Sequence, residues 1–372
     1  MAQPIQTRLT LLFGKNEKDV TENLMPDLLS FEFDDKESNE ADEISITLKD
    51  EKGMWAGRFC PKGGEVVRAI IVSGDTMGGV RGVKRDCGRF YVDTMTAAGS
   101  PRTFELKAVS IPLKTPIRRK LKTRAWEKYT LKDIAGKIAK EANIALVYDA
   151  DDPISYDRQD QDRESDLKFL SRLCEEAGLS IKVSDEKLVI FDQQAYEKKQ
   201  PVRTFALGVS DILSWNFQAQ QSETYKTCTV KYRDPKQKKR GTAASYDTEL
   251  DKNWAEVSGE GKKASKNPAV MSYTYTDPQA EENGQEYALK RRAKSIEEAK
   301  RLAKAKLRQL NARKVTGNIT IIGDPGLNAG DVITISGFGS FDGNMIISNA
   351  SHSISSSGYV TSLSLRRVNS DY

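Results

Sequence analysis

Histidine and cysteine are scarce in this sequence of 372 residues, which contains one histidine and four cysteines. Ser–His or Cys–His catalysis, and any zinc site with several histidines, would have to be built around the single His352. The cysteines form no CxxC pair, so free buried thiols in a reducing compartment are expected at Cys60, Cys87, Cys174 and Cys228. We therefore predict no catalytic, no cofactor-binding and no metal-binding residues.

Long apolar segments are also missing. No run of about 20 apolar residues occurs, which argues against a membrane-spanning helix. Residues 1–19 do not show the charged and then apolar order of a secretion signal. The 58 Lys and Arg residues only slightly outnumber the 53 Asp and Glu residues, and the net charge of +5 does not by itself suggest nucleic-acid binding. The length predicts two or three domains.

Residues 1–113 alternate between apolar and polar side chains, as strands do when one face packs on a core. The alternation is clear at Phe31 and Phe33 and along residues 44–48. Glycine-rich turns separate the predicted strands. The acidic residues 34–43 are interpreted as a solvated hairpin loop between two of them. We expect a first antiparallel β-barrel domain over residues 1–113.

Residues 114–200 predict a small α/β insert domain. One amphipathic helix is expected after Thr130, whose side chain can cap it. A second helix is expected to open at Ser165 and to end at Gly178, a residue suited to a left-handed helix terminus. A β-hairpin over residues 180–191 follows.

Two charged stretches lie within this α/β domain. The basic residues 114–128 begin between Pro112 and Pro116 and are interpreted as an extended linker, with a patch for nucleic acid or an acidic partner as the alternative. The acidic residues 149–166 lack the bend glycine and the terminal Glu of a calcium-binding loop, which favours a solvated loop.

The remaining residues predict a second β-barrel domain that is interrupted once. Residues 201–234 and 313–372 carry the strand pattern, and residues 235–312 form a hydrophilic insertion and a long basic helix. The run from Lys236 to Arg240 is interpreted as a surface loop rather than a DNA contact. The overall expectation is an α+β fold that is mainly β.

The basic helix has the clearest helical pattern in the chain. Ser295 and Glu298 have the spacing of a capping box. An apolar stripe follows at Ala293, Ile296, Ala299, Ala303, Leu307 and Leu310. The bases expected off that stripe are Lys300, Arg301, Lys304 and Arg308. We expect this helix to expose a strongly positive face.

The two β regions resemble each other. Each contains a Gly-acid turn leading into a strand, a glycine turn leading into a second strand, and a third alternating strand. The first copy runs through Pro61–Val67, Cys87–Asp93 and Phe104–Val109, and the second through Leu327–Ile333, Asp342–Ser348 and Leu363–Val368. The spacing between the glycine turns differs, which predicts an insertion at Gly78-Gly79. We interpret the pattern as a duplicated β-domain.

Three stretches together resemble the phage late control D family, the baseplate hub proteins of contractile tails, and the hub half of type VI secretion spike proteins. The most specific is the helix segment from Gln161 to Leu179, with Phe169-Leu170 and Arg172-Leu173 at its centre. The others are Asp42–Asp50 followed by Pro61-Lys62-Gly63-Gly64, and Gly330-Asp331-Val332 followed by Gly337–Gly343, His352 and Gly358–Thr361.

The resemblance implies a structural protein without enzymatic activity. In that family the hub is a homotrimer whose two β-barrel tube domains per chain form a pseudo-sixfold ring. The ring joins a trimeric spike to a hexameric tail tube. Other implied partners are further baseplate proteins and the tape measure protein, with no membrane and no specific nucleic acid. The implied location is the baseplate of a virion, a tailocin or a related injection particle that is assembled in the bacterial cytoplasm.

Two other classes of function were weighed. A tail-associated cell-wall hydrolase would need two carboxylates about 5–10 Å apart, which a count of acids does not exclude. A Ser–His pair at His352 is disfavoured, because neighbouring residues of a strand point to opposite faces. A nucleic-acid-binding protein is the other alternative, based on residues 114–128, the Lys236 run and the basic helix, although no recognition fold supports it.

Overall fold

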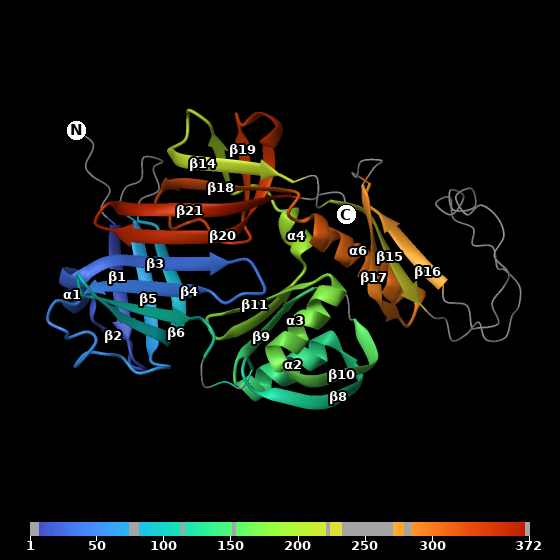
Figure 1. Cartoon of the computed structure of the whole chain (residues 1–372), viewed down its shortest axis with the longest axis horizontal. Helices are drawn as coiled ribbons and strands as arrows, with labels where there is room; N and C mark the ends of the chain where they lie inside the picture. The colour runs from blue at the N-terminus through green and yellow to red at the C-terminus, as the bar shows by residue number, and fades with distance from the viewer. Residues whose placement is uncertain are drawn as a thin grey trace, which may run out of the picture. The chain divides into compact units, whose positions relative to one another are not determined.

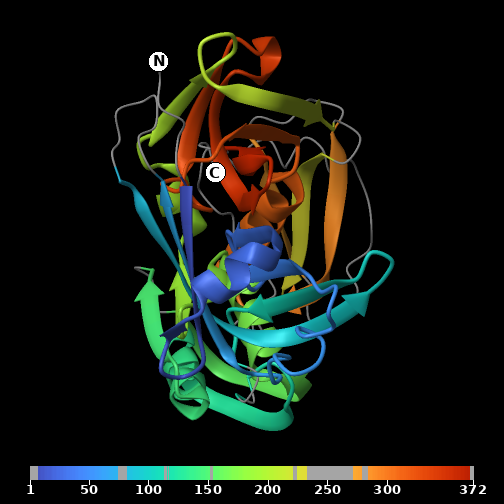
Figure 2. The same ribbon diagram turned by 90° about the vertical axis from the view of Figure 1, so that its left-hand side faces the viewer.

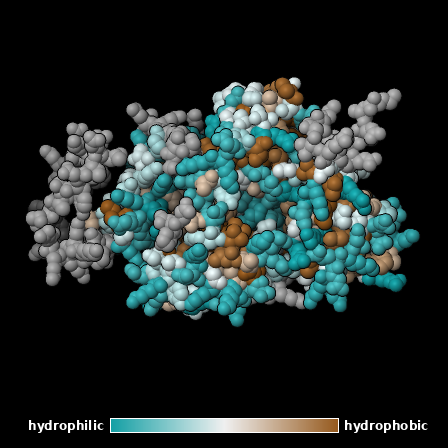
Figure 3. Space-filling view, turned by 180° about the vertical axis from the view of Figure 1, so that it is seen from behind, coloured by the Kyte–Doolittle hydropathy of each residue, from teal (hydrophilic) through white to brown (hydrophobic). Residues whose placement is uncertain are grey.

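The computed structural model describes residues 7–73, 82–112, 115, 117–150, 154–220, 224–232, 271–278 and 284–368. They divide into a main unit (Met1–Thr224 with Gln309–Tyr372) and a small unit (Tyr225–Arg308). Antiparallel strands dominate (Figure 1). Among the described residues, every helix is too short or too polar to cross a lipid bilayer. On the face seen in Figure 3 the surface is mostly hydrophilic, with hydrophobic side chains in separate groups.

The first part of the main unit is an antiparallel sheet, here named the first β-unit. Its strands follow the order β3-β4-β7-β6-β5-β1-β2. The alternation seen in the sequence buries one face of each strand, as Phe31 and Phe33 of β3 show at 0% and 2% exposure. The elements are β1 (Thr7–Phe13), β2 (Lys18–Asp19), α1 (Thr21–Leu24), η1 (Met25–Asp27), β3 (Leu28–Lys36), β4 (Glu43–Lys49), β5 (Val66–Ser73), β6 (Lys84–Ala98) and β7 (Thr103–Val109).

The last part of the main unit forms the second β-unit, with its own apolar core. Its strand order is β14-β18-β21-β20-β19-β13. The core includes Ile319, Ile333 and Ile347, each with 0% exposure. The elements are β13 (Arg203–Ala206), β14 (Ile212–Ala219), β18 (Val315–Ile322), β19 (Val332–Ser336), η3 (Gly339–Phe341), β20 (Gly343–Ser355) and β21 (Gly358–Arg367).

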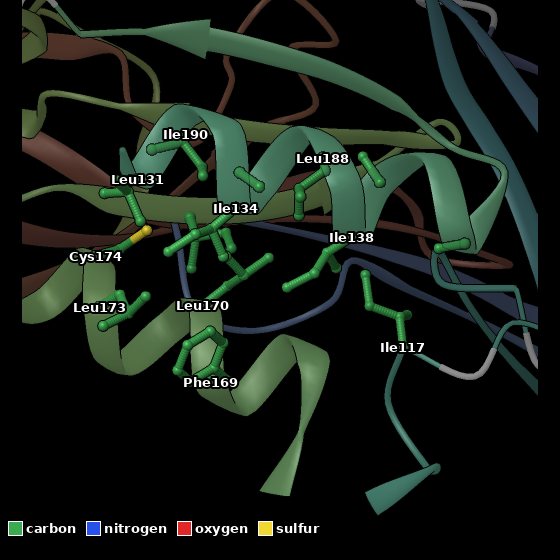
Figure 4. Close-up of a cluster of buried hydrophobic side chains, with 14 of the residues drawn as sticks. Ile117, Leu131, Ile134, Ile138, Phe169, Leu170, Leu173, Cys174, Leu188 and Ile190 are labelled. Atoms are coloured by element: carbon green, nitrogen blue, oxygen red, sulfur yellow. The ribbon is translucent and has the colours of Figure 1, made fainter. Parts of the chain in front are cut away.

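The insert between the two β-units packs two helices on a small sheet. Ile134 and Ile138 of α2 face Leu170 of α3 and Leu188 of β12 across an apolar core (Figure 4). The elements are β8 (Leu121–Thr130), α2 (Leu131–Ala142), β9 (Ala145–Asp149), β10 (Ser155–Ser165), α3 (Asp166–Ala177), β11 (Ser180–Ser184), β12 (Lys187–Phe191) and α4 (Gln193–Glu197). The insert therefore has a hydrophobic core of its own.

The caps predicted for these two helices are confirmed. The side chain of Thr130 accepts a hydrogen bond from the backbone N–H of Asp133, whose carboxylate reaches back to Thr130. Ser165 caps α3 in the same way through Lys168 N. Gly178 ends α3 with φ of 76°, the left-handed conformation in which glycine is strain-free. These local signals fix where both helices begin and where α3 ends.

Much of each charged stretch of the insert is a strand, so the interpretation as a linker and a loop is wrong for residues 121–128 and 155–165. Residues 121–130 form β8 and residues 155–165 form β10, and the two pair antiparallel. In the sequence these strands resemble polar loops, because most of their residues are charged and few apolar side chains mark the inner face of the two-stranded ribbon. Opposite charge along the two strands favours the pairing. Within the first stretch, Lys114 lies outside the described residues.

The predicted repeat is present in the strand order. Numbered along the chain and leaving out β2, the six strands of each β-unit lie in the order 2-3-6-5-4-1. The pairing of the first strand differs, since β1 is antiparallel to β5 while β13 is parallel to β19. Because six strands can be ordered in many ways, the shared order supports the duplication predicted from the sequence.

Both β-units also share their irregularities. β6 has an extra residue, Asp93, where it pairs with β7, and β20 has Ser348 at the same point opposite β21. Strands β3 and β14 likewise each carry one extra residue, Leu29 and Leu213, opposite β4 and β18. Bulges that recur at matching positions are designed features of a fold. They fix the residue-by-residue correspondence between the two β-units.

The predicted glycine turns obey this correspondence. Gly64 N donates to Val92 O and Gly330 N donates to Ile347 O, both over 2.7 Å. Both glycines have positive φ, 79° and 90°. The third strand is a correction: the bulges align Leu106 with Leu363, two residues away from the alignment expected above. A shift of two keeps the same face inward, so the sequence pattern could not reveal it. Gly78 and Gly79 lie outside the described residues.

The small unit has a three-stranded sheet and most of a helix. Its elements are β15 (Tyr225–Tyr232), β16 (Met271–Thr276), β17 (Gln285–Ala293) and α6 (Ile296–Asn311). Residues 225–232 were expected in the second β-domain, but β15 pairs with β16 and β17 in this separate sheet. Most of the hydrophilic insertion, residues 233–270, lies outside the described residues.

The basic helix is confirmed with two corrections. Its predicted stripe is buried at Ala299, Ala303 and Leu307, and Ser295 Oγ accepts from Glu298 N over 3.2 Å. Residues 290–293 belong to β17, so the helix begins later than the apolar stripe suggested. Arg308, expected on the exposed face, is only 8% exposed.

Replacing Ile134 with Ala tests the insert core. Ile134 is fully buried, so the cavity should lower the free energy of unfolding by about 2–5 kcal/mol. The matched control is Lys140→Ala on the exposed side of the same helix, which should change it by less than about 0.5 kcal/mol. Urea denaturation followed by circular dichroism measures both. Equal effects of the two substitutions would contradict the assigned core.

A candidate assembly site at the junction of the two β-units

The two β-units are joined edge to edge by β3 and β20, which lie side by side in Figure 1. Residues 30–36 pair antiparallel with residues 349–355, so both units belong to one 13-stranded sheet. Because β3 also pairs with β4, it is hydrogen-bonded along both edges. This junction is the largest contact made between the two related parts of the chain.

His352 lies at the centre of this junction. It is fully buried, its ring stacks on Phe33 with centroids 5.8 Å apart, and its Nδ1 lies 2.8 Å from Tyr359 Oη. Burial and the nearby Arg85 lower the pKa of His352 to about 3. The single histidine is therefore a neutral packing group at neutral pH. Ser351 instead pairs with Glu32 on the other side of the strand.

A buried ion cluster lies at one end of the junction. Asp35 accepts from Arg85 over 2.7 Å and from Lys182 of the insert over 2.6 Å, and Lys182 also lies 3.0 Å from Asp42. Arg85 donates to the Leu327 carbonyl over 2.9 Å. The cluster thus links the first β-unit, the insert and the second β-unit.

The charges of this cluster balance against burial. Burial alone would raise the pKa of Asp35, but Lys182 and Arg85 outweigh it and hold that pKa below its usual value. Burial raises the pKa of Asp42, and the neighbouring Asp35 adds to the effect. Buried ions of this kind are stable only as a complete set, because removing one partner leaves an uncompensated charge.

A second buried ion cluster is centred on Arg366 of β21. Its Nη2 lies 2.7 Å from Glu37 and its Nη1 lies 2.6 Å from Glu197 of the insert. Gln193 donates to Glu37 as well, over 2.8 Å. Burial opposes the charged guanidinium, but Glu37 and Glu197 outweigh it and raise the pKa of Arg366. This cluster ties the same three parts together a second time.

The interpretation of residues 34–43 as a solvated loop is wrong for three of its six acids, while Glu40 is exposed as expected. Asp35, Glu37 and Asp42 are 6%, 8% and 2% exposed. Their partners come from positions far along the chain, which a single sequence does not connect. One signal was available: Asp35 and Glu37 continue the inward alternation that begins at Phe31 and Phe33.

The basic residues 114–128 are partly used inside the insert. Lys122 and Arg124 both pair with Asp166, and Arg124 Nη1 lies 2.9 Å from Glu141. Arg124 also lies over the Trp126 ring, 4.3 Å from its centroid. These two bases are therefore not available as a free patch for an acidic partner or a nucleic acid.

The cysteines are free, as expected. Burial raises the pKa of Cys87 to about 12 and that of Cys228 to about 11. Cys60 is exposed, so the expectation of burial is wrong for that thiol. Among the described residues, no three His, Cys, Asp or Glu side chains gather to hold a metal ion. The absence of catalytic, cofactor and metal residues stays a prediction.

Breaking the second ion cluster tests its role. Arg366→Met leaves two carboxylates buried without their cation and should lower the free energy of unfolding by about 3–5 kcal/mol. Arg158→Met removes a cation whose side chain is 57% exposed, and should cost less than about 1 kcal/mol. Guanidinium denaturation measures both, and a small effect of Arg366→Met would contradict the role of this cluster in holding the three parts together.

The pH dependence of stability tests the state of His352. Its pKa is about 3 in the folded chain and about 6.5 when unfolded. The unfolded state therefore binds a proton first as the pH falls from about 6 to 4, and the free energy of unfolding should drop by about 1.4 kcal/mol per unit from this group. His352→Phe should lose that part of the slope. Equal slopes for both proteins would contradict the assignment.

Comparison with known proteins gives a consistent result. The model of the family described as phage tail baseplate hub (GPD) matches residues 112–358. A probable baseplate hub protein of Escherichia phage 186 is 26% identical over 371 residues, covering 96% of this chain and 92% of that relative.

Solved structures share the fold across nearly the whole chain. The 43 kDa tail protein of prophage MuSo2 from Shewanella oneidensis has a TM-score of 0.68 at 14% identity, covering 98% of this chain and 99% of that one. An E. coli component of the type VI secretion system has a TM-score of 0.52 at 12% identity, covering 100% of this chain and 78% of that one. Since the family model spans more than half of the sequence, the chain belongs to the phage tail baseplate hub family.

Proposed function

We propose that three copies of this baseplate hub form a ring of six similar β-units that joins a trimeric spike to a hexameric tail tube. The observation that carries the proposal is the duplication, with one strand order and matching bulges in both β-units. Each β-unit is proposed to act as a β-barrel tube domain. A ring with two such units per chain has threefold symmetry and approximate sixfold symmetry at once, which suits it to both neighbours.

The proposed role is structural and not catalytic. The two buried ion clusters join the first β-unit, the insert and the second β-unit into one body, as a part that transmits force requires. Domain limits of 1–113, 114–200, and 201–224 with 313–372 are part of the proposal, and β15 belongs to the small unit. Other baseplate proteins and the tape measure protein are proposed as further partners, with assembly in the bacterial cytoplasm before incorporation into the tail.

The mass of the purified protein and its partners test this function. Light scattering should give three times the chain mass of 41.5 kDa, and negative-stain images should show a threefold ring with six similar lobes. The spike and tube proteins of the same particle should co-purify with it. A monodisperse monomer that binds neither would contradict the proposal, and clearing of peptidoglycan in a zymogram would favour a hydrolase.

A further inference from the structure

We propose that neighbouring copies of this chain are joined by β14 of one copy pairing antiparallel with residues 94–98 of β6 in the next. The pairing repeats, between copies, the junction that β3 and β20 make within one chain. The number of copies rests on the proposed function, but the strand pairing rests on the duplication alone.

Because of the duplication, β14 and residues 94–98 of β6 are the counterparts of the two strands that form the in-chain junction. Matching the bulges aligns β14 with β3 and β6 with β20. Among the described residues, β14 pairs only with β18, whereas β3 has partners on both edges. Within the part of the chain that the structure describes, residues 94–98 pair only with β7, whereas their counterparts in β20 also pair with β3. Figure 2 shows the β6–β7 hairpin, in cyan to teal, extending at the side of the first β-unit.

The exposure of apolar side chains points to the same two edges. Trp215 of β14 is 49% exposed, while its counterpart Phe31 is fully buried. Met95 of β6 is 37% exposed, while its counterpart Ala350 is fully buried. An open edge with exposed apolar residues is a liability unless it has a partner. Each copy thus exposes the counterpart of β3 on one edge and the counterpart of β20 on another, and both counterparts are buried in the in-chain junction.

The register of the pairing follows from the in-chain register. Ser351 lies opposite Asp34, and His352 lies opposite Phe33. Transferred through the bulges, Thr96 of one copy lies opposite Gln218 of the next, and Ala97 lies opposite Phe217. We call β14 the donor edge and residues 94–98 of β6 the acceptor edge. Because these edges are different surfaces of the chain, the contact is head-to-tail, and it closes into a ring when the rotation between copies allows it. In a ring of three, six similar junctions alternate within and between chains.

Cysteine cross-linking tests the register directly. In a Cys60→Ser background, Thr96→Cys with Gln218→Cys should form an intermolecular disulfide on mild oxidation, giving covalent dimers and trimers on a non-reducing gel. Opposite residues of an antiparallel pair lie about 4.5–5.5 Å apart at Cα, within disulfide range. The control pair, Thr94→Cys with Gln218→Cys, is two residues out of register and should give little product.

A mixing experiment tests the head-to-tail geometry. Trp215→Glu spoils the donor edge and Met95→Glu spoils the acceptor edge, so each variant alone should be a folded monomer by light scattering and circular dichroism. A mixture of the two retains one intact junction and should form one-to-one dimers. Leu213→Glu is the matched control, since its counterpart Leu29 stays 42% exposed beside the in-chain junction. That variant should assemble as the unmodified protein does.

The outcomes separate this inference from the proposed function. A trimer that fails to cross-link in this register, or that survives both Glu substitutions, overturns the strand pairing and leaves the trimeric hub standing. Cross-linking in register within a dimer or an open filament supports the pairing and overturns the ring of three. An unmodified protein that stays monomeric at all concentrations overturns both.

Discussion

Three acids at the end of strand β3 and in the segment after it hold the main unit together. Asp35, Glu37 and Asp42 are buried where the two β-units and the insert meet, because Arg85, Lys182 and Arg366 pair with them there. The acids come from one short segment, whereas the three cations come from β6, β11 and β21. Ion sets of this kind add little net stability over an apolar core, but they penalise every incorrect arrangement. We interpret them as the groups that fix how the three parts dock.

The β3–β20 junction depends on that docking. Its hydrogen bonds would be equally good after a slip of two residues, because strand pairing alone does not distinguish such registers. The ion clusters at its end, and the stack of His352 on Phe33, select one register. The two β-units share a topology but contribute different charges to the clusters: Asp35 and Arg85 belong to the first β-unit, and Arg366 belongs to the second.

The sequence predicted local structure well and long-range polar contacts poorly. Helix caps at Thr130, Ser165 and Gly178, and the glycine turns at Gly64 and Gly330, depend on neighbours along the chain and were found. The ribbon of β8 and β10 was missed because few apolar side chains mark its inner face. The burial of the acids in residues 34–43 was missed because the cations that make it possible lie far away in the sequence. His352 was recognised as isolated, but its place at the junction was not.

The connection between the second and third strands of each β-unit has one further consequence. In the first β-unit it is the short segment 37–42, and in the second it is the long segment 220–314, which contains the small unit. Around the proposed ring, short and long connections would alternate from lobe to lobe. One surface could then offer six near-identical positions while another offers three distinctive ones. A single insertion into one copy of a duplicated gene would be enough to convert sixfold into threefold recognition.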